Sequence, residues 1–184
     1  MSELVTQLRQ DHEHISRLLE ILSKQAEHLA AGEFTDYRII TDVMHYIVNY
    51  PNVYHHPGED AVIAELKDRD ISSSDLVDEI LDEHRSMSLE SNKILDEMIQ
   101  IQGNAIFSRD DLVSRLKAFI RNYHAHIDKE EKSVFPRAEA ALTVDDWKKI
   151  KDKLGAAGTR EFDSVLDREY RDLYNFIMSE DKDT

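Results

Sequence analysis

Apolar residues recur every three or four positions through most of this chain, which is the spacing of one face of an α-helix. No segment shows sustained alternation of apolar and polar residues, so we predict an all-α fold. The connections are short, and short connections place consecutive helices side by side and antiparallel. The pattern predicts an up-down four-helix bundle over residues 1–140, with helices at about 2–31, 35–67, 74–102 and 108–136.

Residues typical of helix ends accompany these boundaries. Gly32 is expected to end the first helix, because glycine readily adopts the left-handed conformation found there. Pro51 and Pro57 should kink or interrupt the second helix, since each removes a backbone donor, and Pro136 should end the fourth. Candidate N-caps precede the second, third and fourth helices: Thr35 or Asp36, Ser73 or Ser74, and Ser108.

Residues 141–184 are predicted to form a C-terminal helical extension. Thr143 is a candidate N-cap for the first of two short helices. Their apolar stripes are Trp147, Ile150 and Leu154, then Leu166, Tyr170, Leu173 and Ile177. We expect these helices to pack on the bundle or to form a dimer contact, so a homodimer is one expected assembly.

Composition narrows the classes of function. The chain has 184 residues, enough for one domain with a sizeable core. Its net charge of −15 argues against nucleic acid or an anionic membrane as a partner. It has no cysteine, which excludes disulfides, thiolate-ligated haem and iron–sulfur clusters. No apolar run approaches the ~18 residues of a membrane span, and the N-terminus lacks the apolar segment of a signal peptide, so we expect a cytoplasmic location.

Polar residues interrupt the apolar stripes at one level of the predicted bundle. Each stripe carries one histidine, and two glutamates join them: His12, His55, Glu59, His84, His126 and Glu130. His12 lies before one His-x-x-x-Glu pair and His84 lies before the other, and the two intervals are nearly equal. An acidic residue directly precedes both His12 and His84. The chain therefore consists of two similar helical hairpins. The legs of each hairpin are about equal in length, so the six side chains should meet in one layer of the core.

This cluster predicts a metal site. A lone histidine on an apolar stripe is more often a packed core residue, and a single His-x-x-x-Glu pair is weak evidence. The repeat is more specific. Two ionised carboxylates in a core need a compensating cation, and no Lys or Arg lies on the stripes at that level. Imidazole and carboxylate ligands without sulfur favour iron or manganese, with zinc as an alternative. Six side chains suit two ions, with each glutamate bridging the pair.

Four segments resemble the helix motifs of the hemerythrin-like (HHE cation-binding) domains: "LRQDHEHISRLL", "YPNVYHHPGEDAVIAEL", "DEHRSM" and "HIDKEEKSVFP". The resemblance covers residues 4–137 and implies a non-haem centre of two iron ions, of Fe–O–Fe type, with bridging carboxylates. By the match of motifs its ligands would be the same six residues. Oxygen-carrying hemerythrins have a second histidine four residues from the first on the third helix. Ile80 and Ser88 stand at these positions here, which argues against reversible oxygen carriage.

Two classes of function follow. The favoured one is a metal-binding protein that binds dioxygen, nitric oxide or iron itself, for sensing, storage or protection. The alternative is a di-iron enzyme, either an oxidase, a peroxidase-like enzyme or a nitric oxide reductase. The sequence shows no catalytic nucleophile or phosphate loop beyond the ligands, so whether the protein is an enzyme stays open.

The polar neighbours of these residues are expected to be ordinary surface or packing residues. His56 with Asp60, and His124 with Asp128, form i,i+4 pairs that we place on outer faces. Asp11 and Glu83 are adjacent to ligands, but adjacent helical residues point about 100° apart, so we favour solvated faces for both. Tyr123 lies one turn before His126, and we interpret it as a packing residue.

Overall fold

The computed structural model describes residues 2–156 and 165–180, and the side chains of residues 2–155 and 170–180. The elements in these ranges are all helical, which confirms the all-α prediction. The α-helices are α1 (Glu3–Ala31), α2 (Tyr37–Tyr50), α3 (His56–Arg69), α4 (Ser74–Gln102), α5 (Arg109–Lys129), α6 (Phe135–Ala141), α7 (Val144–Ala156) and α8 (Val165–Glu180).

Most of the predicted helix ends occur where the sequence placed them. Gly32 ends α1 with φ of 72°, and its N–H donates to carbonyl groups of the last turn. The Asp36 side chain accepts from the backbone N–H of Arg38 at the start of α2, and Ser108 caps α5 in the same way. Ser73 precedes α4, but its side chain makes no capping bond and donates to the Asp70 carbonyl group instead.

Proline produces π-helical turns in two of the long helices. Pro51–His55 is a π-helical turn between α2 and α3, and Glu130–Val134 is another between α5 and α6. Each turn ends two residues before a proline, Pro57 or Pro136, whose missing N–H removes one bond of the α-helical ladder. The prediction that Pro136 ends the fourth helix is wrong, because the helical path continues through it to Ala141.

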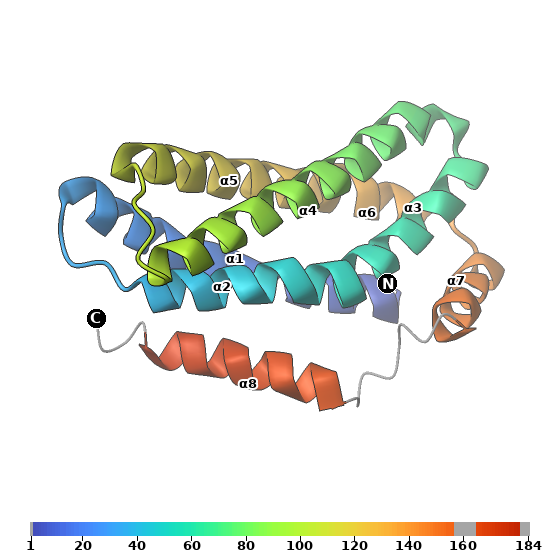
Figure 1. The fold of residues 1–184 in the computed structure, drawn as a ribbon. Helices are drawn as coiled ribbons and strands as arrows, with labels where there is room; N and C mark the ends of the chain where they lie inside the picture. Colours follow the sequence, from blue (N-terminus) through green and yellow to red (C-terminus); the bar gives the residue numbers. More distant parts are fainter. Residues whose placement is uncertain (1, 157–164, 181–184) are drawn as a thin grey trace.

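The four long helical segments form a closed bundle (Figure 1). α1 packs along α5 and contacts α2, while α4 packs along α2 and contacts α5. The buried apolar side chains form two clusters, one toward each end. On α1 the boundary between the clusters falls between Leu8 and Ile15, and on α4 it falls between Ile80 and Met87. A polar layer occupies this gap.

The two C-terminal helices both lie against the bundle. α7 contacts α3 and buries Ile150 and Leu154, and the Thr143 hydroxyl accepts from the backbone N–H of Asp146 at its start. α8 lies along α2 on the outside of the bundle (Figure 1). Ile177 is its buried anchor, whereas the side chain of Leu166 lies outside the described residues. Within the described ranges, none of the helices is both long and apolar enough to cross a membrane.

Candidate metal centre

Six polar side chains fill the gap between the two apolar clusters. None of the six residues has more than 6% of its surface exposed to solvent. The two π-helical turns are part of the layer, because His55 closes the first turn and Glu130 opens the second. The structure thus brings together all the residues that the sequence placed in this layer: His12, His55, Glu59, His84, His126 and Glu130.

Glu59 faces histidines of both hairpins. Its Oε1 lies 3.2 Å from His12 Nε2 and 3.1 Å from His55 Nε2. Its Oε2 lies 3.4 Å from His84 Nε2. The carboxylate therefore extends between the histidines of the first hairpin and those of the second.

Glu130 has the matching position in the second hairpin. Its Oε1 lies 3.4 Å from His84 Nε2. Its Oε2 lies 3.2 Å from His12 Nε2 and 3.3 Å from His126 Nε2. The two carboxylates thus lie side by side between the four imidazoles.

The converging atoms lack hydrogen-bond partners. Their separations are short, but the contacts lack the alignment of hydrogen bonds, and an unpaired buried polar atom is costly. The unpartnered atoms in the described structure include Nε2 of His12, His84 and His126 and both oxygens of Glu59 and Glu130. Cations between them would satisfy these atoms, so the residues fit a metal site.

The donor atoms fall into two overlapping groups. In each group, the ligand atoms all lie within 4.8 Å of one another. The groups are His12, His55 and Glu59, and Glu59, His84, His126 and Glu130. Glu59 belongs to both groups and so connects them.

A carboxylate lies behind each of the four histidines. A carboxylate only accepts hydrogen bonds, so Nδ1 of each ring carries the hydrogen, and in the neutral ring Nε2 keeps its lone pair toward the centre. From Nδ1 to the carboxylate oxygen, the distances are 2.8 Å for His12–Glu131, 3.3 Å for His55–Asp11, 3.0 Å for His84–Asp60 and 2.8 Å for His126–Glu83.

These outer carboxylates correct three expectations. Asp11 is 3% exposed, so the solvated face expected for it is wrong, and Glu83 is engaged with His126. Asp60 does not pair with His56 but accepts from His84. The sequence does contain a signal for these carboxylates. An acidic residue precedes His12 and His84, the lone histidine of each hairpin, and another acidic residue follows Glu59 and Glu130. The periodicity of a single helix does not reveal these contacts, because they run between helices.

The family comparison agrees with this geometry. The family model described as "Hemerythrin HHE cation binding domain" matches residues 3–138. The chain belongs to the hemerythrin HHE cation-binding domain family. No curated protein and no solved structure matches the chain at a significant level of similarity.

Protons occupy His12, His55 and His84 of this hemerythrin domain when no cation is bound. Burial lowers the pKa of His55, but the charges of Glu59 and Asp11 outweigh it and raise the pKa to about 9. Burial also opposes protonation of His84, yet Asp60, Glu130 and Glu59 raise its pKa to about 12. Burial raises the pKa of Glu59, but the neighbouring imidazoles hold it well below its usual value. The metal-free centre therefore holds the protonated imidazoles of His55 and His84 beside the ionised carboxylate of Glu59.

His56 does not lie on an outer face, which corrects the sequence prediction. It is buried, and its ring stacks on that of His84 with centroids 4.3 Å apart. Burial and the positive charge of His84 lower its pKa well below the usual value, so it is neutral. His56 Nε2 is buried without a hydrogen-bond partner among the described residues. His124, in contrast, is exposed as predicted, and Asp128 pairs with Lys132 rather than with it.

Tyr123 is more than a packing residue in this hemerythrin domain. Its ring meets His126 edge-on, with centroids 6.3 Å apart. Its hydroxyl group is buried and has no hydrogen-bond partner in the described structure. Burial, together with the charges of Glu59 and Glu130, raises the pKa of Tyr123 well above its usual value. The protonated hydroxyl is thus an unused donor beside the cluster.

Proposed function

We propose that the six-residue cluster holds two iron ions and that the loaded centre binds dioxygen or nitric oxide. His12 and His55 would hold one ion, and His84 and His126 the other, with both glutamates bridging. The observation that carries this proposal is the position of Glu59 and Glu130. Each carboxylate has its two oxygens toward histidines of different hairpins, and none of the four oxygens accepts an aligned hydrogen bond in the described structure.

Nitrogen and oxygen donors support iron over softer metals. The cluster has four imidazoles and two carboxylates and no sulfur. Two six-coordinate ions need more donor atoms than these side chains supply, so positions remain for small ligands. When bound, the iron pair would supply one-electron redox chemistry. The protein would orient the imidazoles through their outer carboxylates and exclude bulk water with the two apolar clusters.

A di-iron enzyme, either oxidase, peroxidase-like or nitric oxide reducing, is the second candidate. One observation favours it: Tyr50, an oxidisable residue, donates a hydrogen bond to Asp11, which holds His55. A tyrosine this close to a ligand fits a centre that exchanges electrons. Manganese and zinc are the alternative metals.

Metal analysis of the protein purified without chelators tests the proposal. We expect about two irons per chain by mass spectrometry and a visible absorption band in air that nitric oxide changes after anaerobic reduction. A Glu130→Ala variant should lose most of this iron, whereas Asp128→Ala, which alters an exposed carboxylate on the same helix, should keep it. Stoichiometric zinc or manganese would reject the iron assignment, and equal metal content in both variants would reject the site.

A further inference from the structure

Five of the seven tyrosines of the chain form one cluster between α2 and α8. Tyr50 is its centre, with ring centroids 5.1 Å from Tyr46, 5.5 Å from Tyr54 and 5.8 Å from Tyr170. Tyr174 extends the cluster from Tyr46 at 6.1 Å. Tyr46 and Tyr50 are buried, while the other three are half-buried. The rings thus lead without interruption from the bundle interior to its surface.

A hydrogen-bonded path joins this cluster to the metal centre. The Tyr50 hydroxyl donates to Asp11 Oδ1 at 3.0 Å, and Asp11 Oδ2 lies 3.3 Å from His55 Nδ1. His55 Nε2 in turn points to Glu59. Tyr50, Asp11 and His55 are all buried, which strengthens the hydrogen bonds of the path.

The second hairpin lacks such a path. When His55 and Glu59 are aligned with His126 and Glu130, the tyrosines at 46, 50 and 54 correspond to Lys117, Arg121 and Ala125. The carboxylate behind His126, Glu83, pairs with Lys129 rather than with a phenol. The bundle and the ligand set therefore form without tyrosines at these positions. Packing α8 on α2 needs apolar rings or aliphatic chains, but it does not need a phenol bonded to the carboxylate of a ligand.

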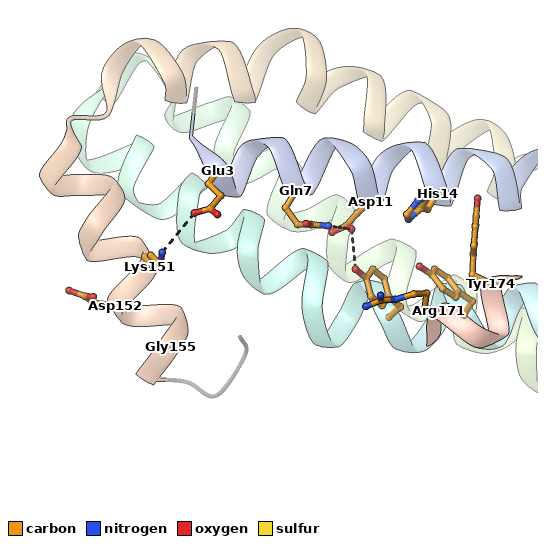
Figure 2. A pocket seen from close by; sticks show the side chains of 11 residues that line it. Glu3, Gln7, Asp11, His14, Lys151, Asp152, Gly155, Arg171 and Tyr174 are labelled. Atoms are coloured by element: carbon orange, nitrogen blue, oxygen red, sulfur yellow. Dashed lines mark hydrogen bonds and ion pairs between the residues drawn. The ribbon is translucent and has the colours of Figure 1, made fainter. Parts of the chain in front are cut away.

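A cavity borders part of the tyrosine cluster. The cavity has a volume of about 980 Å³ and lies between α1, α2, α7 and α8. Asp11, Tyr46, Tyr50 and Tyr174 are among its lining residues. Figure 2 shows Asp11, His14 and Tyr174 along one side of it and Lys151 and Asp152 on the other. A small molecule in the cavity would lie against Tyr46, Tyr50 and Tyr174.

We infer that the five tyrosines relay single electrons from a donor in the cavity to the metal centre, through Tyr50. This inference rests on the proposed iron centre. With iron bound, the centre would supply the redox chemistry that reduces a peroxide to water, and it would then need electrons in return. Tyr50 then gives one electron to the centre and its phenolic proton to Asp11 along the existing hydrogen bond. One peroxide accepts two electrons and two protons in all.

The tyrosine neighbours of Tyr50 return it to the reduced, protonated phenol. Tyr46, Tyr54 or Tyr170 gives an electron to the Tyr50 radical, which takes its proton back from Asp11. The neighbour releases its own proton to water and regains an electron and a proton from an organic one-electron reductant such as ascorbate. Each electron thus crosses the cluster by steps between rings 5.1 to 6.1 Å apart.

Electron paramagnetic resonance of the iron-loaded protein tests the relay. Mixed with hydrogen peroxide in the absence of a donor, the loaded protein should give a tyrosyl radical signal that ascorbate removes. Tyr50→Phe keeps the ring but lacks the oxidisable phenol, so we expect the signal to fall at least about tenfold and reduction of the oxidised centre by ascorbate to slow by a similar factor. Tyr37→Phe is the matched control, because Tyr37 is also on α2 but packs against Phe107.

Iron content and the melting temperature of each variant are measured alongside, so a folding defect is recognised directly. Tyr170→Phe, at the half-buried end of the cluster, is the second variant and should slow reduction by ascorbate at unchanged iron content. A signal that survives in Tyr50→Phe and disappears in Tyr123→Phe would overturn the relay but leave the iron centre standing. Absence of iron from the purified protein would overturn both.

Discussion

Glu83 Oε2 lies 2.8 Å from Nδ1 of His126, although the two residues belong to different helices. The same relationship holds between Asp11 and His55 in the first hairpin. The acid that precedes the lone histidine of each hairpin therefore supports the second histidine of the same hairpin. Asp60 and Glu131, which follow the two glutamates, support the lone histidines of the opposite hairpin. The outer carboxylates thus repeat the symmetry of the four histidines and tie the two hairpins together.

Removing one outer carboxylate should weaken metal binding without removing a ligand. In Glu83→Gln the imidazole of His126 loses its charged acceptor, and we expect metal affinity to fall roughly 10–100-fold. Competition with a chromophoric chelator measures the affinity.

Glu79→Gln is the matched control for this change. Glu79 lies one turn away on α4 and shares Lys129 with Glu83, but it does not contact a histidine in the described structure. Its variant should bind metal as the unmodified protein does. Equal losses in the two variants would mean that surface charge near Lys129, rather than support of His126, determines the affinity.

The sequence specified the bundle and the inward layer because both follow from the position of a residue on its own helix. His12, His55, His84 and His126 lie on apolar stripes, and a period of 3.6 residues is enough to place them. The outer carboxylates depend on contacts between helices. Asp11 points about 100° away from His12, and this angle directs it toward the neighbouring helix rather than toward solvent.

Helical periodicity also did not predict the π-helical turns or the direction of the His56 side chain, for a different reason. A π-helical turn adds a residue to the helix, so the stripe shifts by one position locally. His56 follows such a turn directly and lies on His84, whereas an unbroken α-helix would direct it outward. Pro57 signalled an interruption, but not which way the side chains would turn.

Chelation should lower the melting temperature. Metal that binds only the folded state adds free energy by mass action, about 3–4 kcal/mol when free metal exceeds its dissociation constant a hundred- to thousandfold. For a domain of this size the chelated protein should then melt roughly 10 °C lower. Differential scanning calorimetry of both forms near neutral pH checks this. A melting temperature indifferent to chelation would show that the imidazolium–carboxylate pairs compensate the buried charges as well as metal does.

The stability of the metal-free protein should fall as pH rises. A histidine of the unfolded chain titrates near pH 6.5, whereas the folded pKa is about 9 for His55 and about 12 for His84. The stability that these two histidines add to the folded state is therefore fully present below about pH 6.5, and it is lost as pH rises through 9 and beyond. The lowered pKa of Glu59 adds stability that is present above about pH 4.5 and lost in acid.

Metal binding displaces the same protons, so its contribution should grow over this range. The difference in melting temperature between loaded and chelated protein should be larger at pH 9 than at pH 6.5. Calorimetric titration in buffers of different ionisation enthalpy should also show protons released on metal binding near neutral pH. No proton release would mean that the histidines are already neutral in the metal-free fold.

Tyr123→Phe should weaken the binding of a small anion at the centre while leaving the metal in place. The Tyr123 hydroxyl is a buried donor without a partner in the described structure, beside His126 and within the influence of Glu59 and Glu130. A buried donor left unpaired costs roughly 1–3 kcal/mol, and an anion bound to the metals offers it an acceptor. Loss of one such hydrogen bond should lower azide affinity about tenfold, measured from the charge-transfer band of the loaded protein. The stability of the chelated variant should be unchanged or slightly higher, because the substitution removes an unpaired polar group from the core.

Tyr37→Phe should alter neither quantity, since Tyr37 lies against Phe107 away from the centre. Unchanged azide affinity in Tyr123→Phe would return Tyr123 to the packing role that its position on the helix first suggested.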